Sequence, residues 1–164
     1  MGQAISTSAL WGAKALLPTP AFAPQFEQVI ESAVTSHGLT PMLMVGDVAR
    51  LMNELCADSD TTLIELAQRQ GRSCGGVIMP LIETADTVSD AIRLILMYNC
   101  LHAEPIHWTG SIRGNQVALT AWLDRPTDVT IQQSERIVRL GTLQIVSALT
   151  EVVGDSFKAV LIRM

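Results

Sequence analysis

Seven side chains able to recognise a small molecule fall in the middle of this sequence. Aromatic residues make up only 4% of the chain, so a local concentration of them is informative. A ligand pocket needs an apolar lining with a few convergent polar groups, and tryptophan, tyrosine and histidine each combine an apolar body with a polar atom. The expected ligand-binding residues are Tyr98, His102, His107, Trp108 and Trp122, with Arg72 and Cys74 approaching from a glycine-rich segment. The alternative for Trp108 and Tyr98 is that they are ordinary core residues.

Metal binding and catalysis are less favoured by the same residues. His102 and His107 have only Glu104 between them as a further possible ligand, which is a poor set for a metal. The sequence contains no P-loop, G-x-S-x-G, G-x-G-x-x-G or H-E-x-x-H motif, and these motifs carry much of the recognisable chemistry of enzymes. We therefore expect no metal, no cofactor and no enzymatic activity. A small enzyme that uses Cys74 or His107 stays open as an alternative.

The three cysteines indicate a reducing compartment. Cys56, Cys74 and Cys100 are an odd number, widely spaced and without a C-x-x-C pair, which fits reduced thiols in a cytoplasmic protein better than a disulfide framework. Each is interpreted as a small buried apolar residue rather than a nucleophile.

Composition limits the partners of the chain. At 164 residues one domain is expected. Hydrophobic residues reach 48% and charged residues only 16%, which indicates a buried pocket, an interface, or both. No apolar run is long enough for a membrane span. The net charge is −5 and the sequence has no lysine and arginine cluster, so this chain by itself is not expected to bind DNA phosphates.

A helix and a β-hairpin must position the aromatic residues. Thr87 or Ser89 can cap the helix, with Asp90 in its first turn, where a negative charge suits the helix dipole. Apolar residues then recur at helical spacing, at Ala91, Ile92, Ile95, Leu96 and Leu101. Gly114-Asn115 predicts a two-residue hairpin turn, because both residue types tolerate positive φ.

That turn fixes the strand register by counting outward. The pairs expected on the core face are Ile112–Val117, Gly110–Leu119, Trp108–Ala121 and Ile106–Leu123, and those on the other face are Arg113–Gln116, Ser111–Ala118, Thr109–Thr120 and His107–Trp122. One face is thus apolar, and the other is polar except for a histidine and a tryptophan at its far end.

The remaining segments predict an α+β domain. Residues 1–21 are expected to be a loosely ordered arm and 22–164 the domain, with helices over 24–36, 42–56 and 63–70, a flexible break at 74–76, and a buried short helix or turn at 77–81, for which a strand is the alternative. A long helix over 129–153 and a final strand over 157–164 follow the hairpin. The expected fold is several helices packed on a small, mostly antiparallel sheet, with the final strand reached by a right-handed crossover.

The long helix predicts a second role as a dimer interface. Its apolar stripe is wider than one packed face needs, and Gly141 allows close backbone approach. We expect Ile137, Gly141, Ile145 and Leu149 to contact a second copy of the chain.

The order of these elements resembles the N-terminal effector-binding domain of AraC-type transcription regulators. The run L-I-E-L-A-Q-R-Q, the glycine-rich apolar segment and then T-V-S-D-A-I-R-L-I-L-M-Y, followed by a hairpin, a helix and a strand, carry the resemblance over 22–164. Nothing in the sequence supports an arabinose site of the kind found in members with a histidine-rich barrel.

The resemblance implies the sensing half of a bacterial one-component regulator. Such a domain binds a small-molecule effector, commonly forms a homodimer and controls an attached DNA-binding domain. The basic helix-turn-helix half of the family is absent from this sequence, so we expect the chain to be part of a longer regulator. The first alternative is a dimerisation module without a ligand.

Overall fold

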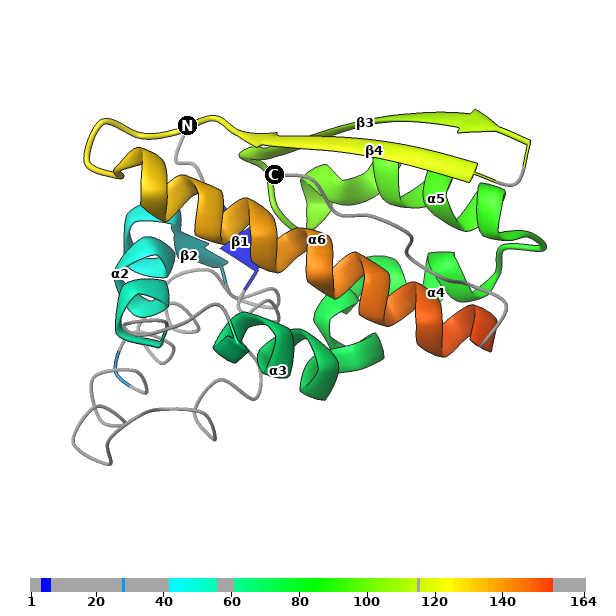
Figure 1. The fold of residues 1–164 in the computed structure, drawn as a ribbon, viewed down its shortest axis with the longest axis horizontal. Helices are drawn as coiled ribbons and strands as arrows, with labels where there is room; N and C mark the ends of the chain where they lie inside the picture. The colour runs from blue at the N-terminus through cyan, green and yellow to red at the C-terminus, as the bar shows by residue number, and fades with distance from the viewer. Residues whose placement is uncertain (1–3, 7–27, 29–41, 56–60, 115, 155–164) are drawn as a thin grey trace.

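The structure is a computed structural model that describes residues 4–6, 28, 42–55, 61–114 and 116–154. It confirms the α+β class, with helices packed on two small antiparallel sheets of two strands each in the part described. Figure 1 shows the β3–β4 hairpin along one side of the molecule, with α5 and the long helix α6 beneath it. None of the described helices is both long and apolar enough to cross a membrane.

The hairpin has the register that counting from the turn predicted. Strands β3 (Ile106–Arg113) and β4 (Gln116–Leu123) are antiparallel, and every expected pair from Arg113–Gln116 to Ile106–Leu123 is present. Gly114 in the turn has φ +59°, a conformation that favours glycine. Asn115 lies outside the described residues.

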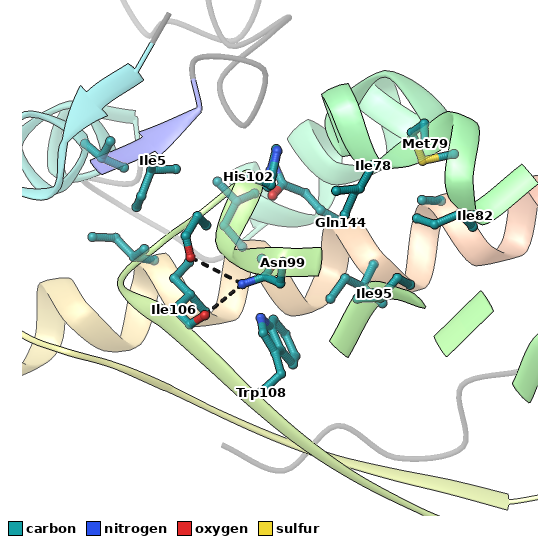
Figure 2. A pocket seen from close by; sticks show the side chains of 17 residues that line it. Ile5, Ile78, Met79, Ile82, Ile95, Asn99, His102, Ile106, Trp108 and Gln144 are labelled. Carbon is teal, nitrogen blue, oxygen red and sulfur yellow. Dashed lines mark hydrogen bonds between the residues drawn. The ribbon is translucent and has the colours of Figure 1, made fainter. Parts of the chain in front are cut away.

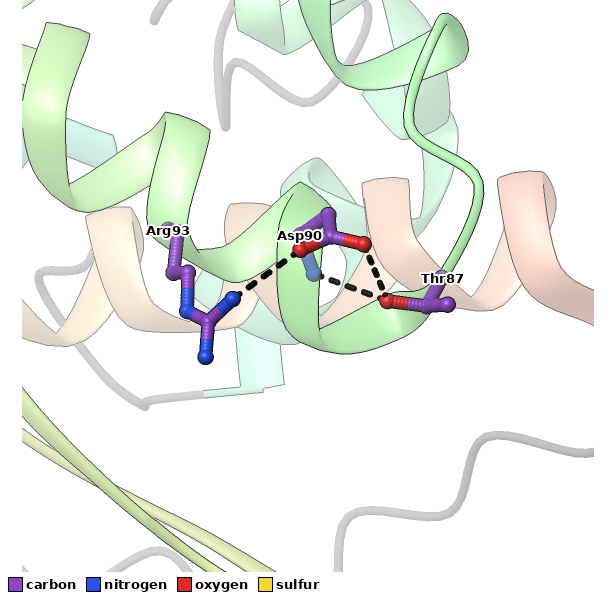
Figure 3. Close-up of polar contacts among 3 residues, drawn as sticks. All are labelled: Thr87, Asp90 and Arg93. Atoms are coloured by element: carbon purple, nitrogen blue, oxygen red, sulfur yellow. Dashed lines mark hydrogen bonds and ion pairs between the residues drawn. The ribbon is translucent and has the colours of Figure 1, made fainter.

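Helix α5 (Val88–Tyr98) begins where the sequence placed it. Of the two possible caps, Thr87 is the one used, because its Oγ1 accepts a hydrogen bond from the Asp90 backbone N–H at 3.1 Å. The Thr87 hydroxyl also donates to Asp90 Oδ2, and Arg93 pairs with Oδ1 of the same carboxylate (Figure 3). That ion pair is exposed and contributes little to stability. The cap at Thr87 is therefore the main local interaction that sets where α5 begins.

Helix α6 (Ile131–Val153) is the long helix that the sequence predicted. It starts at a capping box, in which the Thr130 hydroxyl accepts from the Gln133 N–H and the Gln133 side chain accepts from the Thr130 N–H. It ends at Gly154, with φ +72°. At 1.5 Å per residue the helix is about 34 Å long, and it packs against α2, α3, η4, α5 and β4.

Two short strands were missed by the sequence. Strand β1 (Ala4–Ser6) pairs with β2 (Met42–Met44), so the helix expected from residue 42 begins only at Val45, as α2 (Val45–Leu55). Part of the segment expected to be a loose arm therefore belongs to the core, since Ile5 is 2% exposed. Strands of three residues are too short to show the alternation that identifies a strand.

The glycine-rich segment is also more regular than predicted. Helix α3 (Thr61–Gln70) leads into a 3₁₀ segment, η4 (Gly71–Ile78), in place of a flexible break, with a kink at Gly76, where φ is 48° and ψ is −123°. Helix α4 (Met79–Glu83) follows, so the expected short helix is confirmed and the alternative of a strand is wrong. Pro80 lies in the first turn of this helix, where proline is tolerated. Of the helix expected over 24–36 only residue 28 is described, and it is helical. The strand expected over 157–164 falls outside the described residues.

The buried apolar side chains form two clusters, and α6 contributes to both. The first core cluster comprises Ile5, Leu43, Val45, Val48, Ala49, Leu51, Met52, Leu63, Leu66, Ala67, Ala103, Ile106, Val129, Ile137 and Leu140. The second core cluster comprises Ile78, Met79, Ile82, Ala91, Ile92, Ile95, Ala148 and Leu149. The N-terminal half of α6 thus packs in one cluster and its C-terminal half in the other.

Replacing the cap of α6 should weaken the fold measurably. Thr130→Ala removes the hydroxyl that accepts from Gln133 N–H, and we expect the free energy of unfolding in urea to fall by about 1 kcal/mol. Thr130→Ser keeps a hydroxyl acceptor at the same place, so its free energy of unfolding should fall by only a small part of that amount. Equal losses in the two variants would show that the cap is not the cause.

Candidate functional site

A partly open cavity, lined mainly by buried side chains, lies between the two core clusters. Its volume is about 50 Å³, which is enough for a few water molecules. The described lining residues are Ile5, Val48, Ile78, Met79, Ile82, Ile95, Asn99, His102, Ala103, Ile106, Trp108, Ile137, Leu140, Gly141, Gln144, Ile145 and Ala148. The cavity is therefore walled by hydrocarbon, with a small set of polar groups.

The polar groups of the lining lie near its middle. Figure 2 shows Asn99, His102, Gln144 and Trp108 around the centre of the cavity, with Ile5 at one end and Met79 and Ile82 at the other. Asn99 and His102 come from the segment that joins α5 to β3, which includes the 3₁₀ turn η5 (Asn99–Leu101). Trp108 comes from β3 and Gln144 from α6.

Asn99 holds the turn between α5 and β3 in place. Its side-chain Nδ2 donates to the Ile106 carbonyl at 2.7 Å and to the Ala103 carbonyl at 3.3 Å. The residue is 7% exposed, so these bonds satisfy buried carbonyls that solvent does not reach. The bonds fix the backbone from which His102 and Trp108 enter the cavity.

A pair of buried amides connects α6 to the end of α3. Gln144 Nε2 donates to Gln70 Oε1 at 2.7 Å, and both side chains are buried. A buried amide is stable only when it is hydrogen-bonded, so this bond fixes where Gln144 lies in the cavity wall.

Trp108 carries a donor without a partner. Its indole Nε1 is buried and finds no hydrogen-bond acceptor, and it is the single buried side-chain nitrogen or oxygen of the described residues in that condition. Leaving a buried donor unsatisfied costs about 1–3 kcal/mol. Such a group in a cavity wall points to an acceptor outside the described residues.

Burial keeps His102 uncharged. The imidazole is only 8% exposed, and desolvation of its charged form lowers the pKa of His102 from its ordinary value of 6.5 to about 4. At neutral pH the cavity therefore contains a neutral imidazole.

A second space, an outer groove, shares Asn99, Ile106 and Trp108 with the lining of the cavity. It has a volume of about 220 Å³ and is lined by Leu96, Met97, Asn99, Cys100, Glu104, Ile106, His107, Trp108 and Trp122. His107 Nε2 is 2.7 Å from Asp124 Oδ2, and the His107 ring stacks on Trp122 with centroids 5.4 Å apart. Trp108 lines both spaces and so forms part of the wall between them.

The structure divides the predicted ligand-binding residues between these places. His102 lines the cavity, His107 and Trp122 line the outer groove, and Trp108 lines both. Tyr98 packs against the second core cluster, which is the core role left open for it. The backbones of Arg72 and Cys74 belong to η4, but their side chains lie outside the described part of the chain.

The expected dimer stripe is used within the chain itself. Ile137 and Leu149 are 3% and 1% exposed, and Ile137, Gly141 and Ile145 line the cavity. Ile137 and Leu149 are therefore covered within the chain, whereas Gly141 and Ile145 are partly exposed, and the dimer interface stays a prediction. The helix has a wide stripe since it packs on the hairpin side and on the α3–η4 side at once.

One of the cysteine predictions was wrong. Cys100 is an exposed thiol, so the prediction that it is buried was wrong, because it lies in η5 beyond the packed face of α5. Cys56 lies outside the described residues. Within the described ranges, no three histidine, cysteine or carboxylate side chains gather closely enough to hold a metal ion.

Sequence reasoning missed the polar part of the cavity wall. Gln144 stands inside the apolar stripe of α6, between Gly141 and Ala148, and a polar residue at a core position is itself a signal. Asn99 follows the last turn of α5 in the same way.

Comparison with known proteins gives no family for the chain. No protein-family model matches the sequence, and no curated protein matches it either. The resemblance to AraC-type regulators therefore stays a prediction from the sequence.

The burial of His102 predicts a specific loss of stability in acid. Because the folded-state pKa is depressed, protonation favours the unfolded chain, so the contribution is complete above pH 6.5 and is lost as the pH falls toward 4. Relative to His102→Gln, which cannot titrate, the free energy of unfolding should fall by about 3 kcal/mol between pH 7 and 4. Parallel curves for the two proteins would contradict this.

A measurement on the unmodified chain tests the same point without a variant. The His102 ring resonances in an NMR titration should remain those of the neutral imidazole down to a pH near 4. A midpoint near 6.5 would show that the ring is not desolvated.

Proposed function

We propose that this chain is a small-molecule-sensing domain that binds its effector in the cavity between the two core clusters. The observation that carries the proposal is the buried Trp108 Nε1, a donor without an acceptor in the wall of a largely apolar cavity. Binding sites typically combine such a lining with a few placed polar groups. Asn99 and Gln144 supply two more, each held in position by its own hydrogen bonds.

The position of the cavity supports a role in signalling. A molecule bound there contacts Ile137 and Leu140 of the first core cluster and Met79 and Ala148 of the second. It would therefore stabilise the arrangement in which both clusters close on it, and a ligand shifts an equilibrium by its difference in affinity for the two states. Helix α6, which belongs to both clusters, is the element that would move or be held.

The resemblance in the sequence supplies the wider context of this proposal. A chain like the effector-binding half of an AraC-type regulator would pass such a change to an attached DNA-binding domain. The acidic balance of the chain, −5 at neutral pH, agrees with a domain that does not itself hold DNA phosphates.

The first experiment is a search for the bound molecule. Native mass spectrometry of the freshly purified chain should reveal a small adduct, or a thermal-shift screen of metabolites should raise the melting temperature by several degrees with one class of compound. A tight dimer with no adduct, and no shift across a broad library, would contradict the sensor and favour the dimerisation module.

A variant that fills the cavity tests where the molecule binds. A Cβ at Gly141 would lie 3.6 Å from Trp108 Cζ2 and 3.8 Å from Ile106 Cδ1, which is ordinary contact, so Gly141→Ala fits. It should raise the free energy of unfolding by roughly 1 kcal/mol, since glycine is unfavourable within a helix. The added methyl group takes room from the ligand, and we expect the affinity for the screened compound to fall about tenfold.

The control for this variant is on the opposite side of the same helix. Gln132→Ala changes an exposed residue of α6 and should leave both the affinity and the cavity unchanged. If Gly141→Ala stabilises the protein but binds the compound as before, the compound binds elsewhere.

A further inference from the structure

The outer groove has an aromatic surface that solvent reaches. Trp122 in its lining is 45% exposed, which leaves a large apolar ring system partly in water. The His107 ring stacks on Trp122, with 5.4 Å between the ring centroids. Trp108 adds a second tryptophan to the same lining. The electron-rich faces of aromatic rings attract cations, and tryptophan attracts them most strongly.

The charges around the outer groove have the sign that a bound cation requires. Glu104 is part of the lining, and no lysine or arginine is. Asp124 is adjacent, since its Oδ2 is 2.7 Å from Nε2 of the lining residue His107. The chain as a whole has a net charge of −5, which draws cations toward its surface. An anion would be repelled here without an opposite charge to pair with.

The rest of the lining decides which kind of cation fits. Leu96, Met97 and Ile106 are apolar, and within the described ranges no three histidine, cysteine or carboxylate side chains gather to coordinate a metal ion. A metal ion or a bare ammonium group is strongly hydrated and needs many polar ligands to replace its water. An ammonium nitrogen covered by methyl groups has the same charge but binds water weakly. Its methyl groups can pack on apolar side chains while its charge lies against an indole.

The size of the outer groove suits a small molecule. Its volume is about 220 Å³, and a water molecule occupies about 30 Å³ of the liquid, so the groove has room for about seven groups of that size. Met97, which is 65% exposed, has an unbranched side chain that can adjust to a bound molecule. A compound as small as choline fills this space.

We propose that the outer groove is a second binding site, which takes a small quaternary ammonium compound with its charge against the exposed part of Trp122 and near Glu104. This site goes beyond the sensing cavity and does not depend on it, although Trp108 lines both spaces. The same ammonium group occurs in lipid headgroups, where a phosphate accompanies it. The acidic surroundings favour the free cation over a headgroup, because they repel the phosphate.

Three probes test the charge of the ligand. Choline carries a trimethylammonium group, its tert-butyl analogue has the same shape with an uncharged carbon in place of the nitrogen, and phosphocholine adds a phosphate. Dissociation constants for the whole chain are measured by NMR titration. Choline should bind about tenfold more tightly than the tert-butyl analogue, and phosphocholine should bind more weakly than choline.

The three affinities also define the results that would overturn the proposal. Equal binding of choline and its tert-butyl analogue would show that the groove selects shape and not charge. Absence of choline binding at about 10 mM would show that the site is too weak to be one. Tighter binding of phosphocholine would overturn the free cation as the ligand and point to a lipid headgroup.

Trp122→Leu removes the aromatic face and keeps an apolar side chain. Because Trp122 is already about half exposed, the fold should tolerate the change. Choline should then bind about tenfold more weakly, while the affinity for the tert-butyl analogue should change by less than about threefold. A choline affinity equal to that of the wild-type chain would overturn the contact with Trp122.

A pair of matched variants separates the local charge from the charge of the whole chain. Glu104→Gln and Glu135→Gln each remove one negative charge, but Glu135 is an exposed residue of α6 outside the lining of the outer groove. Choline should bind about threefold more weakly to Glu104→Gln and as before to Glu135→Gln. Equal affinities of the two variants would overturn the role of Glu104.

A measurement on the wild-type chain covers the case in which a variant does not fold. Protons held over an aromatic face are shielded, so the methyl signal of choline should move upfield on binding, together with shifts of the Trp122 and His107 ring resonances. An unmoved methyl signal with bound choline would overturn the proposal. Each of these results leaves the sensing function standing, since that function is tested with another molecule in another cavity.

Discussion

The packing of α6 in two places at once is the constraint on which the rest of the structure depends. A single helix of 23 residues supplies Ile137 and Leu140 to the first core cluster and Ala148 and Leu149 to the second. Helices in water are marginal without tertiary contacts, so α6 depends on both clusters and each cluster depends on α6. The capping box at Thr130 and the glycine at 154 only set where this helix begins and ends.

The region between the two clusters is where polar residues enter the interior. Gln144 reaches Gln70 across it, and Asn99 ties the end of α5 to the start of β3. A continuous hydrocarbon core would need none of these groups, and each one lowers stability unless it is satisfied. Their presence, with one donor left over at Trp108, is the basis on which a binding site is proposed.

The sequence predicted the parts of the fold that have strong local signals. The hairpin register followed from one turn at Gly114, because the alternation of side chains has a fixed period of two. The start of α5 followed from its cap at Thr87, and the extent of α6 followed closely from its apolar spacing. Helix α5 ends at Tyr98, however, and Leu101, which the apolar spacing had included, lies exposed in η5. The strands β1 and β2 did not, since three residues give no period, and their pairing joins segments far apart in the chain.

The candidate site was less predictable because it depends on contacts between distant segments. His107 and Trp108 are neighbours on one strand, so their side chains leave opposite faces. Both nevertheless line the outer groove, and Trp108 also lines the cavity, which the register alone does not show. Gln144 meets Gln70 only through the packing of α6 on the end of α3, a contact that no local pattern reports.

The division of the interior also determines how the molecule opens. Amide hydrogens exchange with solvent when cooperative units of a protein unfold locally. The two core clusters meet at a polar boundary, so each cluster is a natural unit of this kind. The backbone of α6 around Leu140 and Gln144 crosses from one unit to the other. Amides there are protected only while both units are closed, so slowed exchange in this one turn would report closure of the whole domain.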